Sequence, residues 1–243
     1  MPPDRPHIIA HRGASAVAPE NTPAAFRRAL AIGVDAVELD VHLSSDGEPV
    51  VIHDPVLGRT ANGSGLVKDL TVADLRRLDA GSWFGEGFAG ERIPTLAEAL
   101  EILRPVRVII EIKNGPIYYP EIAGRVAAVV RSSGHRAVTI SSFDHHALLQ
   151  LHALAPDIET AALFSARLVN PVNLARDARA QYLHPHWAYA TLDLIEAAHA
   201  AGLRVEVWTI DDPTHMAEMT HRGVDGIMTN VPDRLRDVLA ARD

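Results

Sequence analysis

Short apolar runs alternate with longer amphipathic segments along almost the whole chain. Several of the short runs are nearly continuously apolar, which is the pattern of parallel strands covered on both faces. The expected strands are residues 7–10, 36–42, 106–113, 137–142, 158–164, 180–185, 203–209 and 224–229. The intervening segments are expected to be helices, at residues 23–33, 95–103, 120–133, 145–154, 170–178, 191–201, 213–222 and 232–241.

Proline and glycine support these helix boundaries. Pro23, Pro213 and Pro232 stand at the first helical position, where the missing backbone N–H costs nothing. Gly33 and Gly223 stand where helices should end, since glycine readily adopts the left-handed conformation of a helix C-terminus. Eight strands alternating with eight helices predict an α/β fold, a (β/α)8 TIM barrel, with a doubly wound open sheet as the alternative.

Residues 54–92 interrupt the alternation. Seven glycines fall in this segment, and a short helix is expected within it at residues 71–79. Long segments inside a compact domain are more often functional than idle. Because this one is too short and glycine-rich for a core of its own, we expect a single domain, residues 1–243, in which 54–92 is inserted after the second strand and caps one end of the barrel.

Composition excludes several classes of function. The chain has 243 residues and a net charge of −8, so a sequence-independent grip on nucleic acid is not expected. It has no cysteine, which excludes disulfides, thiolate metal sites and cysteine nucleophiles. No leader-like apolar run precedes the first strand and no window approaches 18 uninterrupted apolar residues, so we expect a cytoplasmic protein without stable membrane insertion. The oligomeric state stays open.

The carboxyl ends of the expected strands carry polar side chains. In a (β/α)8 barrel these ends form the active site. Strand residues two apart point to the same face, so Glu38 and Asp40 share a face, and so do Glu111 and Lys113. Three carboxylates in one mouth repel one another unless something cationic lies between them. Oxygen ligands suit Mg²⁺ or Ca²⁺ rather than zinc, although pairing with arginines at strand ends is the alternative.

Two histidines lie close to these carboxylates in the expected barrel. His11 ends the first strand and His53 follows the second, and a histidine pair suits acid–base chemistry near neutral pH. His42 continues the Glu38 and Asp40 face, but a turn follows and we give it little weight. His184 and His186 flank a proline near the end of the sixth strand, and either could face a pocket.

Lysine is rare in this chain. Of the 23 basic residues only Lys68 and Lys113 are lysine. A compact, rotatable ammonium differs chemically from a planar guanidinium, so a lysine two positions after Glu111 indicates a chosen group rather than a generic surface cation. Trp208, near the end of the seventh strand, could wall the pocket or fill the core, since tryptophan is usually largely buried.

Several motifs occur together and in a fixed order. They begin with His11-Arg12-Gly13, Pro19-Glu20-Asn21-Thr22, Glu38-Leu39-Asp40-Val41 and His53-Asp54. They continue with Arg59-Thr60, Ile93-Pro94-Thr95-Leu96, Glu111-Ile112-Lys113, Ser141-Ser142-Phe143, Trp208-Thr209 and Thr229-Asn230-Val231-Pro232. Together they resemble the signature of glycerophosphodiester phosphodiesterases over nearly the whole chain, with a weak match at residues 165–190.

The resemblance implies a barrel enzyme that hydrolyses a small-molecule glycerophosphodiester to glycerol 3-phosphate and an alcohol. It implies that His11 and His53 are the acid–base pair. Glu38, Asp40 and Glu111 would hold one divalent cation, Mg²⁺ or Ca²⁺. The substrate would be bound by Arg12, Lys113 and Trp208, the first two through its phosphate oxygens.

Two other functions stay open at this point. A lysophospholipase D-like enzyme, which hydrolyses lipid phosphodiesters, would want an apolar rim, and Trp83, Phe84 and Phe88 in the insertion could supply one. A barrel that binds phosphodiesters without hydrolysing them is the other candidate. Loss of a histidine or of a carboxylate would favour it, but both histidines and all three carboxylates are present.

Overall fold

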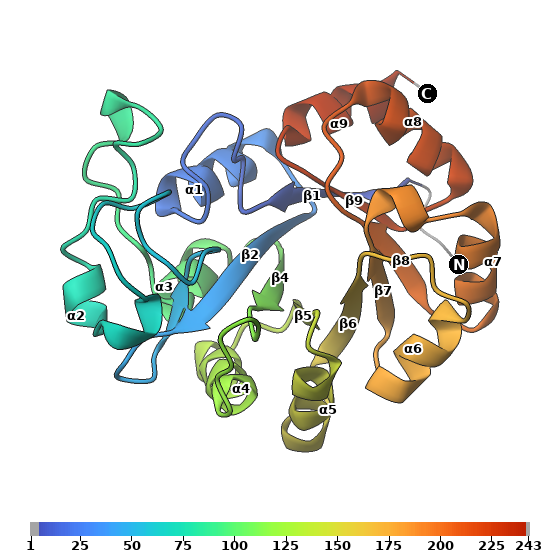
Figure 1. The fold of residues 1–243 in the computed structure, drawn as a ribbon. Coiled ribbons are helices and arrows are strands. Elements are labelled where there is room, and N and C mark those ends of the chain that lie inside the picture. Colours follow the sequence, from blue (N-terminus) through green and yellow to red (C-terminus); the bar gives the residue numbers. More distant parts are fainter. Residues whose placement is uncertain (1–4, 242–243) are drawn as a thin grey trace.

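In the computed structural model, which describes residues 5–241, eight parallel strands close into a barrel surrounded by helices (Figure 1). Going round, the order is β1-β9-β8-β7-β6-β5-β4-β2, and β1 pairs with β2 to close it. The TIM barrel is therefore confirmed and the open-sheet alternative is wrong. The strands are β1 (His7–His11), β2 (Ala36–Leu43), β4 (Arg107–Ile112), β5 (Val138–Ser142), β6 (Glu159–Phe164), β7 (Tyr182–Pro185), β8 (Arg204–Val207) and β9 (Gly226–Thr229).

The helices begin and end where the sequence indicated, within a few residues. They are α1 (Pro23–Ile32), α3 (Leu96–Ile102), α4 (Ile122–Ser133), α5 (His145–Leu154), α6 (Pro171–Ala178), α7 (Leu192–Ala200), α8 (Pro213–Arg222) and α9 (Pro232–Ala240). Thr22 caps α1 by accepting from the Ala25 backbone N–H, and Gly33 ends it at φ 84°. None of the helices in residues 5–241 has the length and apolarity that a bilayer crossing requires.

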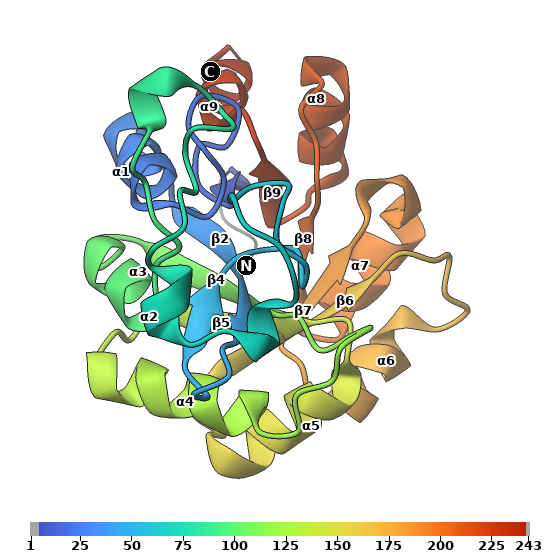
Figure 2. The same cartoon turned by 60° about the vertical axis from the view of Figure 1, so that its left-hand side comes forward.

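A further strand, β3 (Pro49–Val51), runs antiparallel to β2 and was not predicted. With three residues it is too short to show a period in the sequence. The insertion follows it and contains η1 (Val67–Asp69), α2 (Val72–Leu75) and η2 (Glu86–Phe88). The views in Figures 1 and 2 place it beside α1, where the Ala24 N–H donates to Glu91 at 3.2 Å.

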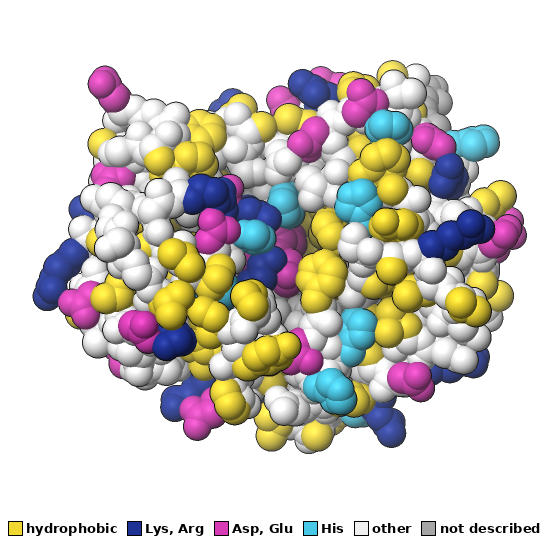
Figure 3. Space-filling model, in the orientation of Figure 1, with side chains coloured by type: hydrophobic (Ala, Val, Ile, Leu, Met, Phe, Trp, Pro, Cys, Tyr) yellow, Lys and Arg dark blue, Asp and Glu magenta, His cyan; other side chains and the backbone are white. Residues whose placement is uncertain are grey.

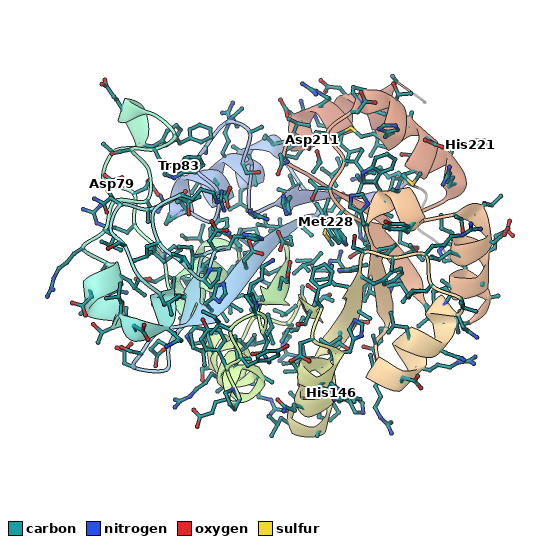
Figure 4. The ribbon with its side chains drawn as sticks, viewed as in Figure 1. Asp79, Trp83, His146, Asp211, His221 and Met228 are labelled. Atoms are coloured by element: carbon teal, nitrogen blue, oxygen red, sulfur yellow. The ribbon has the colours of Figure 1, made fainter. Side chains whose placement is uncertain are left out.

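The helix expected at residues 71–79 is only four residues long, and Asp79 turns the chain a few residues after it. Its carboxylate accepts from the backbone N–H groups of Gly81 at 2.8 Å, Ser82 at 2.7 Å and Gly90 at 2.7 Å, which turns the chain at that point (Figure 4). The insertion packs in an apolar cluster separate from the main core: Val50, Ile52, Leu57, Ala61, Val67, Leu75, Ala80 and Ile93.

The barrel interior is partly polar. Its apolar part is the cluster of Ile9, Ala36, Ile109 and Met228, but Glu206 lies beside it with no exposed surface. Gly226 makes room for that side chain, because a Cβ there would lie 3.0 Å from the Glu206 Cγ and 2.8 Å from the Ile9 Cδ1. The glycine at the start of β9 is therefore part of how the barrel accommodates a buried acid.

Candidate active site

A cavity of about 140 Å³ opens at the carboxyl ends of the barrel strands. In the space-filling view the surface is hollowed there, and acidic, basic and histidine side chains meet in the hollow (Figure 3). Met228, labelled in Figure 4, is one of the residues that line it. The lining includes all the predicted site residues except Asp40: His11, Arg12, Glu38, His53, Glu111, Lys113 and Trp208. Asp40 lies behind this wall with no exposed surface.

The three carboxylates converge as the strand faces indicated. Glu38, Asp40 and Glu111 each offer an oxygen, and these oxygens lie within 4.8 Å of one another. Burial, together with the neighbouring carboxylates, raises the pKa of Glu38 and of Glu111. Although burial opposes it, the ammonium of Lys113 and the guanidinium of Arg12 hold the pKa of Asp40 well below its usual range. Such a buried, mutually repelling set of oxygens fits a hard divalent cation.

Lys113 and Arg12 both contact this cluster. The Lys113 Nζ lies 2.6 Å from the Glu111 Oε1 and 3.0 Å from the Asp40 Oδ1. The Asp40 Oδ1 nevertheless has no hydrogen-bond partner within residues 5–241. The Arg12 Nε lies 3.2 Å from the Asp40 Oδ2, and the Arg12 backbone N–H donates to Glu38 at 3.1 Å. The two cations therefore balance carboxylates here and also stand where an anion in the cavity would meet them.

The motif at Glu20 and Asn21 positions this cluster as well as beginning α1. Glu20 accepts from the Arg12 guanidinium at 2.7 Å. The Asn21 amide donates to the Asp40 Oδ2 at 2.8 Å and its oxygen accepts from the Asp40 backbone N–H at 3.3 Å. Arg12 and Asn21 both have φ 58°, an uncommon conformation for residues other than glycine that often occurs at functional sites.

His11 is held in one tautomer. Its Nδ1 lies 2.8 Å from the Asn230 Oδ1. The Asn230 amide nitrogen donates to Asp211 at 2.7 Å, and its backbone N–H does so at 2.8 Å, so the amide oxygen must face His11. The His11 Nδ1 therefore donates, and its Nε2, 3.9 Å from Glu38, keeps a free lone pair. Burial and the charge of Arg12 lower the pKa of His11 to about 4, so the ring is neutral near pH 7.

His53 has a charged partner instead. Its Nδ1 lies 2.6 Å from the Asp54 Oδ1. Arg59, in the insertion, donates to Asp54 at 2.5 Å and to Glu20 at 2.9 Å, and its hydrogen bonds lower the pKa of Asp54 to about 2. Burial lowers the pKa of His53, while Asp40 and Asp54 oppose that shift. Both ring nitrogens of His42 are in hydrogen bonds. The Nε2 lies 2.9 Å from the His53 carbonyl, and the Nδ1 lies 3.1 Å from the Tyr119 hydroxyl.

The far wall of the cavity is aromatic. Trp208 packs edge to face on Phe143 at 5.6 Å, and its Nε1 donates to the His184 carbonyl at 2.8 Å. The sequence left Trp208 open between wall and core; in the structure it lines the cavity and also packs against the apolar cluster inside the barrel. Sequence reasoning gave little weight to His184, which lines the cavity, and did not single out Asp211. Asp211 comes two residues after the Trp208-Thr209 motif, at the end of the seventh strand, and that position is the signal that could have found it.

Comparison with known proteins adds independent findings. A profile of the glycerophosphoryl diester phosphodiesterase family matches residues 11–234. The chain is 43% identical to a glycerophosphodiester phosphodiesterase of Caldanaerobacter subterraneus, over 94% of this chain and 95% of that one. An Oleispira antarctica phosphodiesterase, solved with the product sn-glycerol-3-phosphate, has 32% identity and a TM-score of 0.89, with 97% of each chain covered. A glycerophosphodiester phosphodiesterase of Agrobacterium tumefaciens has 35% identity and a TM-score of 0.84, over 96% and 99% of the two chains.

Proposed function

Since the chain belongs to the glycerophosphoryl diester phosphodiesterase family and hydrolyses glycerophosphodiesters to glycerol 3-phosphate and an alcohol, we propose that the cavity at the barrel mouth is its active site. One observation carries the proposal. His11, His53 and a cluster of carboxylates meet in a cavity of about 140 Å³, the place where barrel enzymes react. The product seen in the Oleispira antarctica relative is of a size and charge that suit this cavity.

Glu38, Asp40 and Glu111 are the proposed ligands of one divalent cation, Mg²⁺ or Ca²⁺. The fit rests on the chemistry of the set: three largely buried carboxylates each offer an oxygen, and these oxygens lie within 4.8 Å of one another. Such a cation supplies charge neutralisation and Lewis acidity at the phosphate. A bound cation would also neutralise the charge of these carboxylates, which Lys113 and Arg12 neutralise in this structure. The two side chains would then be available to bind the nonbridging phosphate oxygens.

The different surroundings of the two histidines support different proposed roles. The His11 Nε2 lone pair takes the proton of the glycerol hydroxyl next to the phosphate, since His11 is neutral and held by an uncharged amide. As this hydroxyl oxygen bonds to phosphorus, the bond to the departing alcohol breaks. His53, in its protonated form, gives that alcohol its proton. Burial lowers the pKa of His53, and the Asp54 carboxylate at its Nδ1 opposes that shift. Water then opens the cyclic glycerol phosphate with the roles reversed, which leaves glycerol 3-phosphate.

The insertion, residues 54–92, is proposed to cap the site within a single domain. Arg59 supports this, because it connects the insertion to the partners of both His53 and Arg12. Trp83, Phe84 and Phe88 pack edge to face on one another, at 5.5 and 5.4 Å, and Trp83 lies apart from Met228 (Figure 4). None of these three aromatic residues is among those that line the cavity, which favours a cap over a lipid-binding rim. Arg59→Ala should loosen the cap and raise KM; unchanged kinetics would contradict this.

A substrate panel tests the function and the route together. Glycerophosphocholine, glycerophosphoethanolamine and lysophosphatidylcholine are offered with and without chelator. Released glycerol 3-phosphate is measured for the first two, and released choline for lysophosphatidylcholine, whose other product keeps its acyl chain. We expect turnover of the first two, loss of turnover on chelation and recovery with Mg²⁺ or Ca²⁺. A transient cyclic phosphate in ³¹P NMR supports the two-step route, whereas its absence under single-turnover conditions favours direct attack by water. Full activity in excess chelator would overturn the cation proposal.

A further inference from the structure

A second cavity, here called the side cavity, adjoins the active-site cavity. Its volume is about 510 Å³. The two cavities share four lining residues: His53, Glu111, Lys113 and Phe143. Most of the other residues around the side cavity belong to the segments that follow β4 and β5, among them Asn114, Tyr118 and Asp144. The side cavity is therefore a neighbour of the proposed reaction centre, separated from it by a common wall.

The proposed reaction directs the departing alcohol toward the side cavity. His11, which takes the proton of the glycerol hydroxyl, lines the smaller cavity and not the side cavity, whereas His53, which protonates the alcohol, lines both. An in-line displacement puts the attacking and departing oxygens on opposite sides of phosphorus. With the glycerol and phosphate groups in the cavity of about 140 Å³, the rest of the alcohol extends past His53.

Two aromatic side chains in the wall of the side cavity keep much of their surface accessible. Tyr118 is 72% exposed and Phe143 is 49% exposed. Phe143 also packs edge to face on Trp208 at 5.6 Å, which holds its ring in place. The face of an aromatic ring attracts a cation, because the π-electrons make that face negative. This wall is therefore suited to an ammonium or trimethylammonium group.

Asp144 adds a negative charge to the same wall. Its carboxylate accepts from the Asn114 side-chain amide at 2.6 Å and from the His146 backbone N–H at 3.1 Å, and both donors are neutral. Lys113, which also lines the side cavity, pairs with Glu111 at 2.6 Å instead. Within residues 5–241 no ion pair neutralises Asp144, so a cation in the side cavity would gain from its charge.

We propose that the side cavity binds a cationic group of the departing alcohol, and that Tyr118 and Asp144 make the enzyme prefer diesters of amino alcohols to those of neutral alcohols. This inference rests on the proposed function, because it concerns the alcohol half of the same substrate. A cation–π contact at an exposed site is worth about 2- to 5-fold in affinity. An exposed ion pair adds a factor of up to about 5. An uncharged alcohol of the same shape gains neither.

Two diesters and three variants test this assignment. Glycerophosphocholine is compared with the diester in which 3,3-dimethylbutanol replaces choline, which keeps the shape and removes the charge. The preference is the ratio of kcat/KM for the two diesters. Comparing this ratio between variant and wild type cancels the different reactivity of the two alcohols. Asp144→Asn removes the charge and still caps α5, since asparagine is as good an N-cap. Tyr118→Leu removes the ring, and Tyr118→Phe keeps it.

The loss should be confined to the charged substrate. We expect Asp144→Asn and Tyr118→Leu each to lower kcat/KM for glycerophosphocholine by about 2- to 5-fold and to leave that of the uncharged diester unchanged. Tyr118→Phe should keep the wild-type preference. Asp157→Asn is the matched control, because it removes an exposed charge just before β6, at the opposite end of the barrel, and it should change neither value.

Other outcomes overturn the proposal. Equal losses on both diesters would mean that Tyr118 and Asp144 are structural, and no loss in either variant would place the alcohol outside the side cavity. Calorimetry with both diesters in a His11→Ala background measures the same discrimination without turnover. A wild-type protein that hydrolyses neither diester would refute the proposed function, and the calorimetric comparison would still decide the role of the side cavity. Thermal unfolding verifies that the variants are folded.

Discussion

Two clusters of buried acids lie inside the same barrel and differ in their charge balance. In the mouth cluster (Glu38, Asp40 and Glu111), three carboxylates face Lys113 and Arg12, and the pKa values of Glu38 and Glu111 are raised by burial and by the neighbouring carboxylates. In the lower cluster (Glu206 with Arg107 and His184), one carboxylate has a guanidinium and an imidazole as partners. Its pKa is depressed although the side chain is completely buried.

The difference distinguishes the proposed cation site from a structural ion pair. Burial alone does not, because both clusters are buried. Carboxylates that raise one another's pKa store an unfavourable energy, which a cation can release when it binds. A carboxylate that is already paired with an arginine does not store this energy, and removing one partner of the ion pair lowers the stability of the fold. The comparison therefore predicts opposite responses when an acid of each cluster is replaced.

The largest effect should come from the histidines at the mouth. His11→Ala and His53→Ala should each lower kcat by about 10²- to 10⁴-fold and leave the fold intact, because each removes a proton-transfer group. His146→Ala, on the outer face of α5, is the matched control (Figure 4). The check is steady-state kinetics with thermal unfolding. Near-normal turnover in either mouth variant would show that the histidine is not catalytic.

Replacing Glu206, the acid of the lower cluster, should lower the stability of the protein. Glu206→Ala leaves Arg107 buried without its partner, so the free energy of unfolding should fall by about 3–5 kcal/mol. Glu121→Ala, which removes the exposed ion pair with Arg125, should change it by less than about 1 kcal/mol. Urea denaturation measures both. Equal, small changes would mean that the lower cluster does not stabilise the barrel.

The pH dependence of stability should follow the same cluster. The pKa of Glu206 is depressed, so its contribution is present above the unfolded value of about 4.3 and is lost as the pH falls. The pKa of His184 is lowered, so the unfolded ring takes up its proton first and stability also declines as the pH drops through about 6.5. Glu206→Gln should reduce the slope of the unfolding free energy against pH in the acidic range. The reduction should correspond to at most one proton bound on unfolding. An unchanged slope in urea denaturation between pH 3 and 5 would exclude Glu206 as its source.

A smaller effect is expected from Asp211, which acts on His11 through Asn230. Asp211→Ala frees the Asn230 amide to turn, so the His11 tautomer is no longer fixed. We expect kcat to fall by roughly 5- to 10-fold, the worth of about one hydrogen bond. ¹⁵N NMR of the His11 ring should show a mixture of tautomers in the variant and one form in the wild type. A single tautomer with unchanged kcat would remove Asp211 from the mechanism.

The sequence was informative where its patterns are local. The alternation of elements predicted the barrel, and spacing of two along a strand placed Glu38 beside Asp40. The rarity of lysine singled out Lys113, which the structure brings to 2.6 Å from Glu111. The roles of these residues stay predictions, because proximity does not show binding or catalysis.

What the sequence could not show depends on distant partners. Glu206 is one acid in an apolar strand, and its partner Arg107 lies 99 residues away. Asp211 and Asn230 are 19 residues apart, and their contact exists only once β8 and β9 are side by side. His184 and Glu206 are 22 residues apart, and their hydrogen bond also joins two different strands. A single sequence contains no local pattern for any of these pairings.

The most direct test is the thermal unfolding temperature of wild type, Glu38→Gln and Glu206→Gln, each with and without Mg²⁺ or Ca²⁺. Without cation, Glu38→Gln should be at least as stable as wild type, because it relieves repulsion at the mouth, and it should lose the stabilisation that the cation gives. Glu206→Gln should be less stable and should keep that stabilisation in full. The account is contradicted if Glu38→Gln is the destabilised variant, or if it is stabilised by the cation as strongly as wild type.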